Sequence, residues 1–145
     1  QHTFQFLTKN PGRLSEFNPW PDNCWVGTTI TNQADADERL PYLMQVEAAV
    51  RFVSHEPLMN EIDVWQYLGG ERDPIGPAYG HRGIEWGIIG GMTGPGAVIQ
   101  GVEWVASLLH QYQSAKVPVF LKNNLHWPEK IQGWPSNGGD QIGEK

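Results

Sequence analysis

Five short runs of almost continuous apolar residues divide the chain, and they constrain its fold more than any other feature. Strands that are buried on both faces have this pattern, whereas strands with one exposed face alternate apolar and polar residues. Such buried strands belong to parallel sheets, in which helices connect one strand to the next. The runs are Phe4 to Thr8, Trp25 to Thr31, Val50 to Ser54, Glu85 to Ile89 and Val117 to Lys122. We therefore predict an α/β protein with about five parallel strands and crossover helices.

The segments between these runs carry the helical patterns that crossovers need. From Gly101 to Ala115, apolar side chains recur at helical spacing and predict an amphipathic helix. From Asp35 to Gln45, a shorter apolar stripe follows acidic residues, which a helix N-terminus favours, and Pro41 either begins this helix or kinks it. Pro11 to Phe17 predicts one or two turns. The stretch from Asn60 to Arg82 is rich in proline and glycine and predicts a long excursion instead of a regular helix.

This order of elements leaves two architectures open, a doubly wound sheet or part of a (β/α) barrel. In both, ligands bind at the carboxyl ends of the strands. All five expected strand ends are polar or rich in glycine: Thr8 to Asn10, Thr31 to Gln33, Ser54 to Pro57, Gly90 to Gly94 and Lys122 to Asn124. The pattern favours a shared site there, although strand ends are polar in most proteins because loops begin at them.

Glu56 is the leading candidate for a general base or a ligand contact. It follows a buried strand directly and precedes Pro57, which fixes the backbone and would direct the carboxylate into the mouth of the sheet. The alternative is a structural carboxylate that pairs with a neighbouring lysine or caps a loop. His55 could shuttle protons near neutral pH. Because adjacent residues of an extended chain point to opposite faces, only one of the two can face a ligand.

The segment from Gly90 to Gly96 contains four glycines, which permit positive φ and let a ligand approach the backbone amides. It is neither a Walker sequence nor a dinucleotide fingerprint. A phosphate or nucleotide cradle therefore competes with a simple tight turn. Lys9 and Lys122 follow the first and last expected strands and could neutralise an anionic substrate, whereas single lysines are more often solvated surface residues.

Seven tryptophans are many for 145 residues. Trp25, Trp86 and Trp104 fall at positions where we expect packing in the core. Trp20, Trp127 and Trp134 each adjoin a proline and belong to loops, where they could stack on a base or a sugar ring. Packing is the simpler expectation for all of them.

Charge and composition exclude several classes of protein. The formal net charge is −6, so a nucleic-acid partner is not expected without a local basic patch. The single cysteine, Cys24, forms no internal disulfide and makes no zinc or iron-sulfur site alone, and the histidines lack metal-ligand spacing. No apolar run spans a bilayer or resembles a signal peptide. We expect a cytoplasmic protein with no membrane partner and no metal bound by this chain.

The two ends of the chain suggest a fragment. A strand-like run begins within three residues of Gln1, which is abrupt for a natural domain, so we expect a cut at the front. Residues 128–145 are rich in Gly, Pro, Asn and Lys and predict an irregular C-terminal tail after one folded unit, residues 1–127. Unpaired strand edges at Phe4 to Thr8 and at Val117 to Lys122 would allow self-association.

Six blocks of the sequence together resemble one known family. They are Thr3 to Pro11, Trp25 to Gln33, Ala36 to Leu40, Val50 to Leu58, Ile84 to Gly96 and Val117 to Lys122, and they follow the order of that family. The family is a bacterial and bacteriophage protein family of unknown function that is related to radical S-adenosylmethionine (SAM) proteins. The resemblance extends over roughly Gln1 to Trp127.

The resemblance implies a partial (β/α) barrel of the radical SAM type. Members of the family carry three cysteines near their start, suited to a [4Fe-4S] centre that reductively cleaves SAM to a 5′-deoxyadenosyl radical. None of these cysteines is present here. The chain would then be the later part of a barrel, without the first two strands or the iron-sulfur loop. SAM and [4Fe-4S] are thus implied for the full-length protein alone, and we expect this chain by itself to be inactive.

The resemblance also implies that the strand ends line a SAM and substrate cavity. The expected cofactor-binding residues are Asn32, Ser54, Glu56, Gly90 and Gly91. The expected substrate-facing residues are Lys9, Thr31, His55, Thr93 and Lys122. No catalytic residue and no substrate can be assigned from the sequence.

The chain departs from the family pattern in one loop and at its last strand. Met92 stands where the family commonly has a carboxylate, and Val98 stands where it has a cation. Asn123 and Asn124 follow Lys122, where the family tends to have Gln-Trp. These departures support an alternative, a non-catalytic binding or partner module with a barrel-derived fold.

Overall fold

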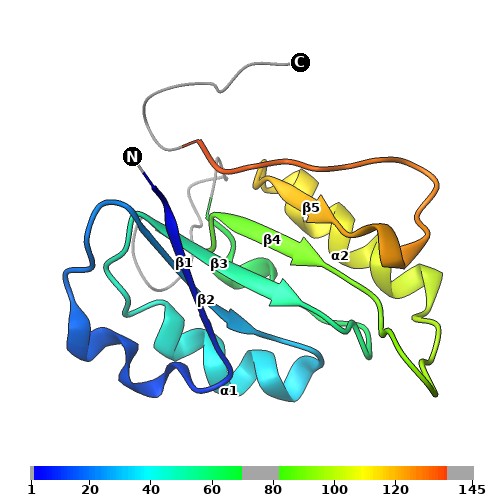
Figure 1. The fold of residues 1–145 in the computed structure, drawn as a ribbon, viewed down its shortest axis with the longest axis horizontal. Helices are drawn as coiled ribbons and strands as arrows, with labels where there is room; N and C mark the ends of the chain where they lie inside the picture. The colour runs from blue at the N-terminus through cyan, green and yellow to red at the C-terminus, as the bar shows by residue number, and fades with distance from the viewer. Residues whose placement is uncertain (1, 70–81, 137–145) are drawn as a thin grey trace.

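Five parallel strands in sequential order form the sheet at the centre of the molecule (Figure 1). The computed structural model describes residues 2–69 and 82–136. The strands are β1 (Phe4–Thr8), β2 (Cys24–Thr29), β3 (Val50–His55), β4 (Trp86–Ile89) and β5 (Val119–Leu121). Each pairs in parallel with the next, for example Phe6 with Val26 and Phe52 with Trp86. The predicted α/β class and five-stranded parallel sheet are confirmed.

Within the described residues, two α-helices connect the strands, and a short 3₁₀ helix follows each of β1, β3 and β5. The α-helices are α1 (Gln33–Leu43) and α2 (Val102–Ser114); the 3₁₀ helices are η1 (Pro11–Phe17), η2 (Trp65–Tyr67) and η3 (Asn123–Leu125). Pro41 lies inside α1 near its end. Residues 70–81 of the predicted excursion lie outside the described residues.

Both α-helices pack on the same face of the sheet. Leu40 and Leu43 of α1 share one apolar core with Val105, Leu108 and Tyr112 of α2, and these residues are almost completely buried. The same core also contains residues of strands β2 to β5: Val26, Val53, Ile89, Val119 and Leu121. This helix-covered face therefore contains most of the buried apolar surface, which is the main stabilising contribution to a fold.

The opposite face carries a smaller aromatic cluster. Trp25, Phe52 and Trp86 are buried there, and Trp134 from the C-terminal segment stacks on Trp86 with ring centroids 4.9 Å apart. The expected core positions of Trp25 and Trp86 are confirmed, whereas Trp104 is only partly buried. Trp134 is in a loop as predicted, but it packs on the sheet with 57% of its surface still exposed.

The two edges of the sheet differ. The β1 edge is exposed along Phe4–Leu7. The β5 edge is covered by residues 131–133: Leu121 N–H donates to Ile131 O and Gly133 N–H donates to Val119 O, both at 2.8 Å. The described part of the irregular tail thus lies against the sheet. The predicted division at residue 127 stays a prediction.

Candidate functional site

The carboxyl ends of β3, β4 and β5 bring three predicted site residues side by side. His55 pairs with Ile89 and Ile89 pairs with Leu121, so the next residues along the chain, Glu56, Gly90 and Lys122, lie in one row at the edge of the sheet. The Glu56 carboxylate forms an ion pair with the Lys122 ammonium. Asn124 Nδ2 donates to Glu56 Oε1 at 3.4 Å. We call Glu56, Gly90, Gly91, Lys122 and Asn124 the strand-end cluster.

Asn124 fixes the turn that follows β4. Its side-chain amide donates to Gly91 O at 3.0 Å and accepts from Gly91 N–H at 3.1 Å. A side chain on Gly90 would place Cβ 2.9 Å from three atoms of Glu56, so the carboxylate can pack there only because residue 90 is glycine. Sequence reasoning placed Asn124 at a strand end and assigned it no role. The sequence feature that could have identified it is a side-chain amide two residues after the lysine at the strand end.

The amides of Gly90 and Gly91 are already bonded within the chain. Gly90 N–H donates to His55 O at 3.0 Å, and Gly91 N–H donates to Asn124 as described. The positive φ expected in this segment occurs later, at Gly94 (95°) and Gly96 (78°), where a Cβ would meet nothing within 4 Å. The glycines at the strand end therefore permit close packing of the chain on itself, and those in the loop permit the turn.

The ion pair of the cluster is accessible to solvent. The Glu56 side chain is 28% exposed and that of Lys122 is 43% exposed. Lys122 also lines a hollow of about 200 Å³ between η3 and residues 127–130. A carboxylate offers several acceptor sites and an ammonium offers three donors, so the pair can hold a polar ligand that presents both kinds of group.

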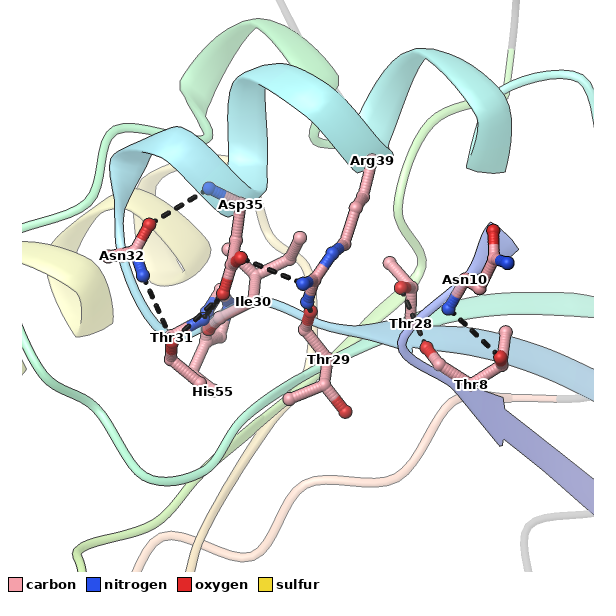
Figure 2. A network of polar contacts seen from close by, with 10 residues as sticks. All are labelled: Thr8, Asn10, Thr28, Thr29, Ile30, Thr31, Asn32, Asp35, Arg39 and His55. Carbon is pink, nitrogen blue, oxygen red and sulfur yellow. Dashed lines mark hydrogen bonds and ion pairs between the residues drawn. The ribbon is translucent and has the colours of Figure 1, made fainter. Parts of the chain in front are cut away.

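A second polar network lies at the carboxyl end of β2 (Figure 2). Asn32 caps α1: its Oδ1 accepts from Asp35 N–H at 2.9 Å, and its Nδ2 donates to Thr31 Oγ1 at 3.2 Å. Thr31 N–H and Oγ1 both donate to Asp35 Oδ2, at 3.0 and 2.8 Å. Arg39 pairs with the other oxygen of Asp35 and donates to Thr29 O. The structure places Thr31 and Asn32 in this network, where they stabilise the start of α1.

The open surface beside this network is a wide hollow of about 730 Å³. Asn32, Gln33 and Ala34 of the α1 start line it together with Asn60, Glu61 and Trp104. Of the predicted cofactor-binding residues, Asn32 lines this hollow, and the strand-end cluster does not contribute to it. The sequence signal for Asp35 and Arg39 was their i, i+4 spacing at the front of a predicted helix.

His55 lies on the helix-covered face and is fully buried. Its Nδ1 faces Ile30 O at 3.1 Å, and because a carbonyl can only accept, Nδ1 carries the proton and donates. Its Nε2 then accepts from the Tyr112 hydroxyl at 2.9 Å. Burial lowers the pKa of His55 to about 4, partly offset by the bond to Ile30, and burial raises the pKa of Tyr112. The predicted division between His55 and Glu56 is thus observed: Glu56 reaches the strand-end cluster and His55 does not.

The remaining predicted residues lie apart from one another. Ser54 is buried on the face opposite the helices, two residues before Glu56. Lys9 is exposed after β1, and Thr93 is exposed in the loop that follows Gly91. Of the ten predicted site residues, the structure brings together Glu56, Gly90, Gly91 and Lys122 in the strand-end cluster, and it brings together Thr31 and Asn32 in the network at the end of β2.

The described residues contain no group of three His, Cys, Asp or Glu side chains that could hold a metal ion. Cys24 is buried at the amino end of β2, far along the strand from the strand-end residues. One buried thiol does not fit an iron-sulfur cluster, which takes several thiolates. Within residues 2–69 and 82–136, no helix has the length and apolarity needed to cross a membrane.

Comparison with known proteins gives one match. The family model for "Protein of unknown function (DUF5131)" matches residues 1–142. No curated protein and no solved structure matches the chain. The match agrees with the expected family of unknown function, and it carries no evidence for a radical SAM relationship or a phage origin. The chain belongs to the DUF5131 family, whose function is unknown.

Proposed function

We propose that the chain is the C-terminal portion of a radical SAM-like protein and that its strand ends contribute to a cavity for SAM and a substrate. The proposal rests on the strand-end cluster, in which a solvent-accessible carboxylate and ammonium meet at the carboxyl ends of three parallel strands. Carboxyl strand ends are the ligand-binding side of α/β proteins.

The topology supports the barrel part of this proposal. The strands follow one another as β1-β2-β3-β4-β5, and both α-helices pack on one face. A doubly wound sheet reverses its strand order and has helices on both faces. Consecutive units of a (β/α) barrel keep sequential order and one helical layer. The described strands form an open sheet whose β5 edge is covered by residues 131–133. On this proposal the first two strands of a partial barrel lie outside residues 1–145 and continue the sheet from β1.

The residues of this chain would bind and orient ligands. Glu56 accepts hydrogen bonds from ammonium or hydroxyl groups, and Lys122 donates to carboxylate or other anionic groups. Asn124 and Gly90 hold Glu56 in place. Because one buried cysteine does not fit an iron-sulfur cluster, no electron-transfer step is assigned to this chain. On this proposal the iron-sulfur cluster is held by a part of the protein outside residues 1–145.

SAM binding to the complete protein tests the proposal. Isothermal titration calorimetry with SAM should show binding that Glu56→Gln weakens by about tenfold, the effect of losing a charge-assisted hydrogen bond. Lys122→Met should weaken binding to a similar extent. Glu38→Gln is the matched control, because Glu38 is an exposed carboxylate on α1 away from the strand-end cluster. Equal SAM affinity in the wild type, Glu56→Gln and Lys122→Met would overturn the site assignment.

A non-catalytic binding or partner module is the second candidate, and two observations favour it. The polar groups of the strand-end cluster are bonded to one another: Glu56 to Lys122 and Asn124, and Gly91 to Asn124. Met92 and the exposed Val98 also place apolar side chains where the resembled family carries charges. This candidate predicts no detectable SAM binding by the complete protein, with or without substitutions at Glu56.

A further inference from the structure

The wide hollow beside the network of Figure 2 is lined by three successive connections at the carboxyl ends of the strands. Residues 32–34 follow β2 and begin α1, Asn60 and Glu61 lie in the segment after β3, and Trp104 lies in the first turn of α2. The volume of about 730 Å³ falls within the range of small-molecule sites, about 300–1,000 Å³. The strand-end cluster contributes no residue to this hollow, which is therefore a separate candidate for ligand binding.

Two glutamine side chains hold the segment after β3 in place. Gln33 of α1 bonds twice to Asp63: its Oε1 accepts from Asp63 N–H at 2.7 Å, and its Nε2 donates to Asp63 O at 3.2 Å. Gln111 of α2 accepts from Val64 N–H and donates to Ile62 O, both at 2.8 Å. The segment is thus tied to both helices. Because the walls of the hollow are fixed before a ligand arrives, binding costs less conformational entropy.

Several polar groups at the hollow have no partner within the part of the chain that the structure describes. Asn32 Nδ2 uses one of its two hydrogens in the network of Figure 2, and the other is free. The side-chain amide of Asn60 and the indole N–H of Trp104 make no hydrogen bond to a described residue. Glu61 Oε1 accepts from Ser107 Oγ at 3.4 Å, and Glu61 Oε2 is unbonded. The hollow therefore offers both donors and acceptors to a ligand.

Trp104 adds a rigid apolar surface to these polar groups. Its ring lies close to Gly101, where a Cβ would be 2.9 Å from Trp104 Cδ2, so the indole can pack there only because residue 101 is glycine. The ring also packs against the helix-covered core, yet it is only partly buried and lines the hollow. A flat apolar ring beside donors and acceptors fits a ligand with an apolar face and a polar rim.

The charge and the donors at the hollow distinguish between classes of ligand. An anion is disfavoured, because Glu61 is the one charged residue among those that line the hollow. A cation would be attracted by the Glu61 carboxylate and the indole face, but it would leave the free N–H of Asn32 without an acceptor. A hydroxyl group donates and accepts, so neighbouring hydroxyls can bond to a carboxylate and to amides together.

We propose that this hollow binds a neutral saccharide, with the C–H face of one pyranose ring on the indole of Trp104. Two neighbouring hydroxyls donate to the Glu61 carboxylate, and the side-chain amides of Asn32 and Asn60 bond to further oxygens of the sugar. This inference goes beyond the proposed function and does not depend on it, because the residues that carry it lie outside the strand-end cluster.

Saturation-transfer difference NMR of the complete protein with neutral sugars tests the proposal. The probes are methyl glucoside, methyl galactoside, maltose and cellobiose at millimolar concentration. Saturation should reach the C–H protons of one ring face most strongly. Trp104→Ala should weaken binding at least tenfold, and Trp104→Phe, which keeps an aromatic face, should weaken it much less. Trp134→Ala is the matched control, because Trp134 is an exposed tryptophan on the other face of the sheet.

Glu61→Ala tests the polar half of the site. It should weaken sugar binding about tenfold, the effect of losing hydrogen bonds to a charged group. Glu38→Ala is its control, because Glu38 is an exposed carboxylate of α1 that does not line the hollow. Absence of saturation transfer to every sugar, or equal transfer in the wild type, Trp104→Ala and Glu61→Ala, would overturn the proposal. Displacement of the sugar by N-acetyl-lysine amide or by adenosine would also overturn it, in favour of a cation site or a nucleoside site.

Discussion

His55 and Glu56 are neighbours in the sequence and belong to two different regions of the molecule. His55 lies in the helix-covered core, fully buried and bonded to Ile30 and Tyr112. Glu56 lies in the strand-end cluster, where its side chain and that of Lys122 remain partly exposed. The alternation of side chains along a strand produces this separation at a single peptide bond.

The difference in burial indicates which polar group contributes to folding and which is available for binding. A buried polar group costs free energy unless it is bonded, so the His55 bonds are a requirement of folding. A half-exposed ion pair contributes little to stability because water competes with it. Substitutions on the helix-covered side should therefore affect folding, and substitutions in the strand-end cluster should affect binding.

Truncation of Tyr112 should have the largest effect. Tyr112→Ala removes a fully buried ring and the hydrogen-bond partner of His55, and should cost about 3–5 kcal/mol of unfolding free energy in urea denaturation. Trp134→Ala, on the opposite face, should cost less than half as much because its ring is mostly exposed. Similar losses in the two variants would contradict the contrast between the faces.

The pH dependence of the unfolding free energy should be the second largest effect. The pKa of His55 is about 4 in the folded chain, against about 6.5 when unfolded, so the unfolded state binds more protons between these values. Stability should be complete above about pH 6.5 and should fall by about 3 kcal/mol as the pH drops toward 4. His55→Gln should remove this dependence in denaturation curves measured at each pH. A wild type whose stability is flat across this window would refute the assignment.

A side chain at Gly87 should cause a smaller loss. A Cβ there would lie 2.4 Å from the Tyr112 ring, so Gly87→Ala should destabilise the fold by about 1–3 kcal/mol through overpacking. Gly12→Ala in η1 is the control, because its Cβ would meet only Asn10, at 3.6 Å. Thermal unfolding of both variants measures the difference, and an undiminished melting temperature for Gly87→Ala would count against the packing described.

The strand-end ion pair should have the smallest effect on stability. Glu56→Gln should change the unfolding free energy by no more than about 1 kcal/mol, as expected for a solvent-accessible pair. Urea denaturation of Glu56→Gln and Lys122→Met measures this. A loss above about 2 kcal/mol would show that the cluster is structural, and the division between folding and binding residues would then fail.

The sequence predicts which segments form the strands more accurately than it predicts where each strand begins and ends. Apolar runs locate all five strands. Burial on both faces explains the runs of β2 and β3, whereas β1 is exposed along Phe4–Leu7, so the expectation that its apolar run is buried is wrong. The last strand begins later than predicted because Lys116 adopts a φ of 55° and Val117 N–H bonds to Tyr112 O, so these residues form the turn that follows α2. β2 ends earlier because Thr31 turns to bond Asp35. Such bonds depend on side-chain geometry that periodicity does not carry.

Only part of the candidate site is predictable from the sequence. Parallel register brings Glu56, Gly90 and Lys122 together, and their places at strand ends are visible in the sequence. The contacts of Asn124 with Glu56 and Gly91 depend on how η3 packs against the strand ends, and no sequence motif predicts that packing. The burial of His55 follows from strand alternation, but its partner Tyr112 lies 57 residues away and only the fold identifies it.

The short segment 131–133 protects the β5 edge of the described sheet. Ile131 O and Gly133 N–H bond to the backbone of Leu121 and Val119, so these groups of β5 are not available to another strand. An uncovered edge is a template for aggregation, which natural proteins avoid by covering it. Three residues with no regular secondary structure of their own thus protect this side of the sheet against edge-to-edge aggregation.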